Sequence, residues 1–147
     1  MLFKKIRMKN TAKILGIVLG LFVIVSCSST NTTSQTVNRK WMLIEFQDFT
    51  KDFLMKKGAN LDLSNKDQYG ANMGCNRMFM KGDFKTNGMV TFSKIGSTMM
   101  YCDDAMKLED AFVKALPTVN YYRTDGHFLT LTSEDGSSMK FVAADWD

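Results

Sequence analysis

The chain has 147 residues, of which 45% are hydrophobic and 12% aromatic, with 19 basic against 15 acidic residues. This apolar content excludes a disordered chain, and the length is that of one domain. With three cysteines and one histidine, the chain has few residues for a metal site or for acid–base catalysis.

The N-terminus has the composition of an export signal. Residues 1–13 carry five basic residues and no acid, and residues 14–25 form an unbroken apolar run of twelve. That run is shorter than the roughly 20 residues that cross a bilayer, and it suits the apolar region of a secretory signal. The following Ser26-Cys27 resembles a lipobox, in which the cysteine thiol receives diacylglycerol and the new N-terminus is acylated. We therefore predict a lipoprotein signal peptide at 1–26 and lipid attachment at Cys27. The alternative is a plain signal anchor with an incidental cysteine.

Removal of residues 1–26 changes the charge balance. These residues hold five of the 19 basic residues and no acid, so 14 basic and 15 acidic residues remain, net −1. The basic excess therefore belongs to the targeting segment and does not predict nucleic-acid binding.

Residues 28–38 are polar and rich in Ser, Thr and Asn. With Cys27 they predict a flexible tether at 27–38 that reaches roughly 18–20 Å. A glycosylated stalk is the alternative, which a bacterial lipobox disfavours. Because Ser28 is not Asp, the signal resembles those that sort to the outer membrane, and we expect the protein there, facing the periplasm.

The folded domain is predicted at 39–147 and is mainly β. In 41–49, alternation places Trp41, Leu43 and Glu45 on one face, and Met42, Ile44 and Phe46 on the other. Further short β-like stretches lie at 59–63, 68–73, 79–86, 89–93, 119–123, 127–132 and 137–143. Asn87-Gly88 predicts a type I′ hairpin with positive φ at both residues, and Asp125-Gly126 and Asp135-Gly136 predict two more turns.

One helix interrupts the strands. Asp103 is its expected N-cap, Asp104 suits the first turn, and Pro117 ends it. The apolar stripe is Leu108, Ala111, Phe112, Ala115 and Leu116, with Lys107, Asp110 and Lys114 outside it. These elements predict a single, partly open antiparallel β-barrel with one covering helix.

Several motifs resemble those of the META/HslJ family of small bacterial envelope lipoproteins. They are Trp41-x-Leu43, Gly70-x-x-x-Gly74-Cys75-Asn76, Thr98-x-Met100-x-Cys102, Glu109-x-x-Phe112-x-x-x-Leu116, Val119-x-x-Tyr122 and Gly126-x-x-Leu129-x-Leu131. The resemblance covers the domain from Trp41 to Phe141. It departs at Met80, where the family usually has Gly, so the course of the chain after Cys75 is expected to differ.

This resemblance implies a lipocalin-like barrel with a helix. It implies no established enzymatic activity, only an association with envelope and heat stress.

Cys75 and Cys102 form an even pair in an exported protein, which favours a disulfide. A redox-active thiol pair and a metal site are the alternatives. The first lacks Cys-x-x-Cys, and the second lacks ligands, because His127 is the only histidine and flanks a predicted turn.

No arrangement of residues predicts catalysis. A Ser-His-Asp or Cys-His site would need His127, and no Gly-x-Ser-x-Gly or phosphate-binding loop is present. The acid pairs Asp103/Asp104 and Glu109/Asp110 are explained by helix capping and by solvated faces. We therefore expect no enzyme and no cofactor.

Five methionines cluster in sequence around the two cysteines, namely Met73, Met78, Met80, Met99 and Met100. Thioethers could bind Cu(I) or consume oxidants. The alternative is that they fill gaps in the core, and alternation along a strand would place Met99 and Met100 on opposite faces.

Two functions fit this sequence. The first is a monomeric, non-catalytic envelope module that contacts a protein, the cell wall or the membrane surface, and the second is a small-ligand binder with an open barrel interior. The predicted core residues favour the first: Trp41, Leu43, Phe46, Phe92, Phe112, Leu116, Tyr122, Leu129, Leu131, Met139 and Phe141.

The motif residues are expected to serve architecture. Gly74, Asn76 and Thr98 are suited to shaping turns and satisfying backbone groups around the cysteines, and Gly70 and Met100 belong to the same motifs. Arg77 is the exception, a cation beside the turn that we expect to face a partner.

Overall fold

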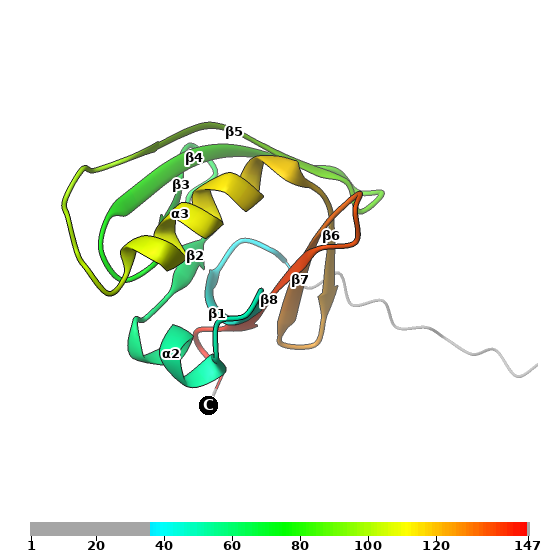
Figure 1. The fold of residues 1–147 in the computed structure, drawn as a ribbon. Coiled ribbons are helices and arrows are strands. Elements are labelled where there is room, and N and C mark those ends of the chain that lie inside the picture. The colour runs from blue at the N-terminus through cyan, green and yellow to red at the C-terminus, as the bar shows by residue number, and fades with distance from the viewer. Residues whose placement is uncertain (1–35, 147) are drawn as a thin grey trace, which may run out of the picture. The chain divides into compact units, whose positions relative to one another are not determined.

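The structure, a computed structural model, describes residues 36–146 (Figure 1). The predicted signal peptide, Cys27 and most of the predicted tether lie outside the described residues. Within them, eight strands, two α-helices and one 3-10 turn follow each other along the chain. In order they are β1 Lys40–Phe46, α2 Lys51–Lys56, β2 Asn60–Asp62, β3 Tyr69–Asn72, β4 Arg77–Phe84, β5 Val90–Ser97, α3 Met106–Ala115, η1 Leu116–Thr118, β6 Val119–Asp125, β7 Phe128–Ser133 and β8 Ser138–Ala143.

The strands form one antiparallel sheet in the order β5-β4-β3-β2-β1-β8-β7-β6. The sheet curls, and α3 lies across its open side (Figure 1). The two edge strands meet at one point. There Met89 forms a β-bridge with Tyr121, and the backbone N–H of Tyr122 donates to the Gly88 carbonyl at 2.8 Å. The predicted partly open antiparallel barrel with a covering helix is confirmed.

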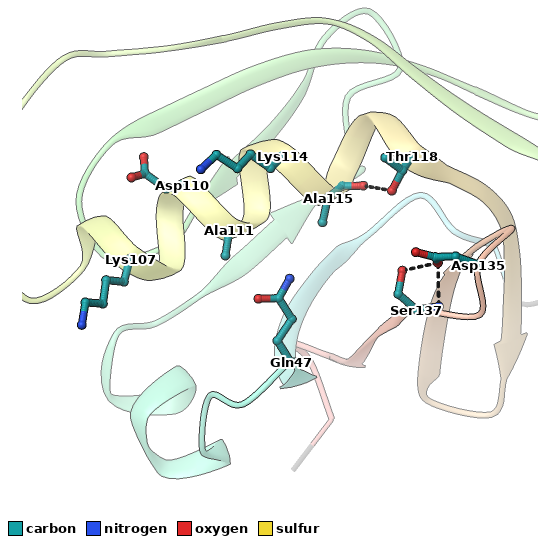
Figure 2. Close-up of a pocket in the computed structure, with 9 residues that line it drawn as sticks. All are labelled: Gln47, Lys107, Asp110, Ala111, Lys114, Ala115, Thr118, Asp135 and Ser137. Carbon is teal, nitrogen blue, oxygen red and sulfur yellow. Dashed lines mark hydrogen bonds between the residues drawn. The ribbon is translucent and has the colours of Figure 1, made fainter.

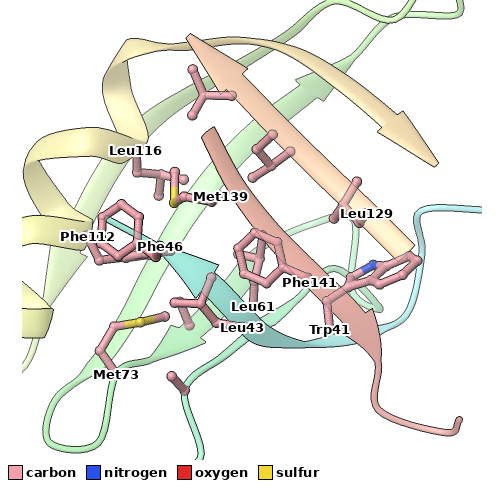
Figure 3. Close-up of a cluster of buried hydrophobic side chains, with 14 of the residues drawn as sticks. Trp41, Leu43, Phe46, Leu61, Met73, Phe112, Leu116, Leu129, Met139 and Phe141 are labelled. Carbon is pink, nitrogen blue, oxygen red and sulfur yellow. The ribbon is translucent and has the colours of Figure 1, made fainter. Parts of the chain in front are cut away.

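Apolar side chains fill the interior (Figure 3). Ten of the eleven predicted core residues are buried, and Tyr122 is half-buried against the same cluster. A hollow bordered by Phe46, Leu131 and Met139 has a volume of only about 30 Å³, which is room for about one water molecule. Among the described residues, the interior is therefore occupied by a packed apolar core.

The chain just before β1 also contacts the core. Val37 packs against the core, and its carbonyl accepts a hydrogen bond from the indole Nε1 of Trp41 at 2.9 Å. Val37, which the sequence assigns to the tether, is therefore part of the packed structure.

Strand β1 contains a β-bulge that the alternation pattern does not reveal. The register with β8 shifts between Leu43 and Glu45. As a result Glu45 is exposed, and Phe46 is buried on the same side as Trp41 and Leu43. The predicted two-faced alternation through Phe46 is wrong because the bulge inserts one residue.

The helices also differ from the prediction. Helix α3 begins at Met106, and its N-cap is Ala105, which makes no side-chain cap. Asp103 is therefore not the N-cap; it lies in a turn in which the backbone N–H groups of Ala105 and Met106 donate to the Cys102 carbonyl. Helix α2 was not predicted. Thr50 caps it by accepting from the Phe53 N–H at 3.3 Å.

The three hairpins form at the predicted positions, but the turn at Asn87-Gly88 does not have the predicted type I′ geometry, because Asn87 has no positive φ. Within these three turns positive φ occurs only at the glycines, with 85° at Gly88, 56° at Gly126 and 86° at Gly136. At Gly88 and Gly136 the glycine N–H donates to the carbonyl three residues earlier. This is a type I turn followed by a left-handed glycine, the usual three-residue hairpin loop.

Neither helix of the described part is long and apolar enough to cross a membrane.

Candidate functional site

Cys75 and Cys102 are joined by a disulfide, with an S–S distance of 2.04 Å and a Cα–Cα distance of 6.0 Å. The bond connects the turn between β3 and β4 to the segment that leads from β5 into α3. The predicted disulfide is confirmed. Among residues 36–146, no group of three or more His, Cys, Asp or Glu side chains is placed to hold a metal ion.

Asn76, next to the disulfide, is the centre of a buried hydrogen-bond network and is only 2% exposed. Its Oδ1 accepts from the Thr98 hydroxyl at 2.7 Å and from the Met100 N–H at 2.8 Å. Its Nδ2 donates to the Met100 carbonyl at 3.0 Å and to Glu109 Oε1 at 2.6 Å. All four hydrogen-bonding positions of the amide are thus used. The amide joins the turn after β3, the end of β5 and helix α3.

Glu109 completes this network. It is 4% exposed, and its Oε2 accepts from the backbone N–H of Asn76 at 2.8 Å. The solvated face predicted for Glu109 is wrong, although its neighbour Asp110 is exposed as expected. The carboxylate lies in the first turn of α3, where the helix N-terminus favours negative charge. Its spacing of three residues from Phe112 is the sequence signal that could have placed it on the buried side.

Thr98 and Gly74 shape the backbone around Asn76. The Thr98 hydroxyl accepts from the Arg77 N–H at 3.1 Å, and the Thr98 N–H donates to the Arg77 carbonyl at 3.0 Å. Gly74 has a φ of 104°, and its N–H donates to the Asn72 side chain at 2.7 Å. Gly70 has no such role, since its φ is not positive and an added Cβ would lie 3.8 Å from its nearest neighbour.

The network holds a short exposed segment, Met99-Met100-Tyr101, which we call the 99–101 loop. The side chains of Met99, Met100 and Tyr101 are 98%, 56% and 80% exposed. The backbone is fixed at Met100 by Asn76 and, one residue beyond the loop, at Cys102 by the disulfide. A hydrogen bond with Asp103 raises the pKa of the Tyr101 hydroxyl above its usual value. The loop is therefore an apolar surface patch on a fixed backbone.

The methionines around the cysteines do not gather at one site. Met73, Met78 and Met80 are buried in the core. Met99 and Met100 lie beyond the end of β5 at Ser97 and are both exposed, so the predicted placement on opposite faces of a strand is wrong. The first three fill the core, and the last two belong to the surface.

A groove of about 360 Å³ runs beside the 99–101 loop. Apart from the loop, its apolar lining comes from Met106 and Val113 of α3, and Asn76 and Glu109 border it as well. Flexible methionines beside a fixed backbone are typical of surfaces that adapt to an apolar partner.

A larger open hollow of about 590 Å³ lies between α3, the end of β1 and the β7–β8 turn (Figure 2). Gln47 extends toward the helix, whereas Lys107, Asp110 and Lys114 project from the helix without converging on it. Asp135 accepts from the Ser137 N–H and hydroxyl, which lower the pKa of its carboxyl. The charged side chains of α3 do not converge here, and Asp135 is engaged within the β7–β8 turn. The residues that line this hollow therefore form no recognisable binding or catalytic group.

The side chains of Arg77 and His127 do not line the groove beside the 99–101 loop. The Arg77 side chain is exposed on the outer face of the sheet, in a hollow of about 420 Å³ that Gly70 also lines. Among the described residues its guanidinium makes no ion pair. His127 lies in the β6–β7 turn and stacks on Trp146 with the ring centroids 3.4 Å apart.

Comparison with known proteins places this architecture in a family. No curated protein matches the chain. Its fold is similar to that of a protein from Burkholderia xenovorans solved by NMR, with 17% identity, a TM-score of 0.59, and coverage of 74% of this chain and 83% of that one. It is also similar to a DUF4847 family protein from Bacteroides vulgatus solved by crystallography, with 12% identity, a TM-score of 0.55, and coverage of 78% and 98%. The profile of the META domain matches residues 34–146. The chain therefore belongs to the META domain family.

Proposed function

We propose that this protein is a lipid-anchored, non-catalytic envelope module that contacts a partner protein through the 99–101 loop. The N-terminal signal and Cys27 support the anchor, and the resemblance to envelope lipoproteins supports a role in envelope or heat stress. The surroundings of two side chains that could act as acids or bases support the absence of catalysis. Glu109 is hydrogen-bonded to Asn76, and the ring of His127 stacks on Trp146.

One observation carries the proposed contact. Three consecutive large apolar side chains are exposed on a backbone that a buried amide and a disulfide hold in place. Contiguous exposed apolar groups mark interaction surfaces in soluble domains. A backbone fixed before binding loses little conformational entropy when the partner arrives.

A site-specific crosslink tests the contact. A photo-crosslinking residue replaces Tyr101 in one variant and Tyr121 in another, because Tyr121 is a second exposed tyrosine, on β6. Illumination of intact cells should give a discrete adduct from position 101, stronger after heat shock, and none from position 121. The adduct should disappear when Met99 and Met100 are also changed to Ser. The same adduct from both positions, or none from position 101, would contradict the proposal.

Anchoring is tested separately. Cys27→Ala should leave an unlipidated precursor held by its signal, whereas the natural protein should fractionate with membranes and carry a lipid mass at Cys27. Mass spectrometry that found a soluble, unmodified mature form in cells would refute the anchor.

A further inference from the structure

We propose that Met99 and Met100 are sites of reversible oxidation, and that their oxidation weakens the contact of the 99–101 loop without unfolding the domain. That Met99 and Met100 are sites of oxidation is argued from the structure of the loop alone. That oxidation weakens the contact of the loop rests on the proposed function.

Met99 and Met100 are the two most exposed methionines of the described part, Met99 by a wide margin and Met100 by about ten percentage points. A two-electron oxidant must reach the thioether, so its rate follows exposure. Met99 and Met100 are 98% and 56% exposed, and Met55 and Met89 are 46% and 45% exposed. The buried methionines, all at most 3% exposed, are Met73, Met78, Met80 and Met139.

The reaction adds one oxygen atom to each sulfur. With hydrogen peroxide, a sulfur lone pair attacks one peroxide oxygen and the O–O bond breaks. The products are a sulfoxide and one molecule of water. Hypochlorous acid gives the sulfoxide and, with loss of a proton, chloride. Sulfur is oxidised by two electrons in both cases, and a methionine sulfoxide reductase with a thiol donor reverses the step.

The fold tolerates this change because the loop is not held by its sulfur atoms. Asn76 binds the backbone N–H and carbonyl of Met100, and neither bond involves the side chain. The Met99 side chain is surrounded by solvent, so a sulfoxide oxygen there displaces no packed group. In Met73 or Met80 the same oxygen would enter the apolar core, at the cost of a buried polar group.

Oxidation changes the surface of the 99–101 loop much more than it changes the stability of the fold. A sulfoxide turns a flexible apolar side chain into a polar one, and two of the three side chains of the loop are thioethers. Oxidation therefore removes most of the apolar character of the loop while the backbone that presents it stays in place.

Mass spectrometry tests the site. The full-length protein is treated with limiting hypochlorous acid, and sulfoxide is measured at every methionine by peptide mapping. Met99 should react first and Met100 next, with Met99 at least about tenfold faster than the four buried methionines. The melting temperature should be unchanged while only the loop is oxidised. Equal rates at Met99 and Met73, or a fall in melting temperature in step with Met99 oxidation, would overturn the inference.

A variant that keeps the apolar surface but lacks the sulfur tests the consequence. The photo-crosslinking assay at position 101 is repeated before and after oxidant, with and without Met99→Leu and Met100→Leu. Oxidant should reduce the adduct in the natural loop by about tenfold, reductase should restore it, and the Leu variant should be insensitive. One outcome is that the Met99→Ser and Met100→Ser changes abolish the adduct while oxidant leaves the adduct of the natural loop unchanged. The proposed effect of oxidation is then wrong, and the proposed contact stands. If the Ser variant leaves the adduct intact, the proposed contact itself is wrong.

Discussion

The buried side chain of Asn76 and the buried carboxylate of Glu109 hold each other across 33 residues of sequence. Asn76 donates to Glu109 through both its backbone N–H and its Nδ2, at 2.8 and 2.6 Å. Glu109 needs no cation here, because two N–H donors and the N-terminus of α3 offset its charge. This pair fixes α3 against the β3–β4 turn and so positions the 99–101 loop.

Asn76→Ala should destabilise the domain by about 2–4 kcal/mol, because it leaves the Met100 carbonyl, the Met100 N–H and Glu109 Oε1 without their side-chain partner. Equilibrium unfolding in urea measures this change. Arg77→Ala, at the next position, removes an exposed side chain and should stay within about 0.5 kcal/mol of the natural protein. An Asn76→Ala protein of full stability that had lost a partner contact would falsify the architectural role of Asn76.

Glu109→Gln should cost about 1–3 kcal/mol, although the side chain keeps its size, because one oxygen becomes an NH₂ group that faces a donor of Asn76. Asp110→Asn is the matched control, since it makes the same chemical change at an exposed neighbour and should have almost no effect. Equal unfolding midpoints for the two variants would show that the carboxylate is not needed.

The double variant Cys75→Ser and Cys102→Ser should lose about 3–4 kcal/mol, as expected for a bond that closes a loop of about this length. The domain should still fold, because its apolar core remains. Alkylation of the denatured natural protein without reductant should label neither cysteine. Labelling of both in protein isolated from cells without reductant would contradict the disulfide.

Gly74→Ala should cost about 1–3 kcal/mol, because the backbone has a φ of 104° and the new Cβ would lie 2.9 Å from Lys57 Cδ. Gly70→Ala is the control from the same motif. It has an ordinary φ and room for a Cβ, so its stability should change by at most about 0.5 kcal/mol. Thermal melting distinguishes the two glycines, and equal losses would show that φ is not the cause.

Asp62 should titrate below its usual range, because the hydroxyl and N–H of Ser64 donate to its carboxylate and Lys40 is nearby. A lowered pKa means that the ionised form favours the folded state. The contribution is therefore complete above the unfolded pKa near 4 and is lost as pH falls through the folded pKa. Ser64→Ala should raise the pKa of Asp62 toward 3.8 in an NMR titration. An unchanged pKa would exclude the hydroxyl as the main cause.

The sequence was enough to predict the strands and the main helix, because these depend on local patterns. Alternation located the strands, the spacing of Leu108, Phe112 and Leu116 located α3, and glycines located the hairpins. The disulfide was predicted from the even pair of cysteines together with the predicted export signal. The burial of ten predicted core residues shows how strongly apolar periodicity specifies the inside.

What the sequence left unpredicted depends on contacts between distant segments. The bulge in β1 is set by the register with β8, which no pattern within β1 contains. The late start of α3 follows from the turn at Cys102, whose partner Cys75 is 27 residues away. Glu109 looked like a surface acid because its two hydrogen-bond donors belong to Asn76.

The disulfide also decides what a protease can release. The exposed 99–101 loop lies between Cys75 and Cys102, so a single cut there divides the chain into two pieces that remain covalently joined. Each piece carries part of the sheet, with β1–β5 in the first and β6–β8 in the second. A molecule nicked at Met99 or Tyr101 therefore migrates as one species on a non-reducing gel, and only a reducing gel reveals the cut.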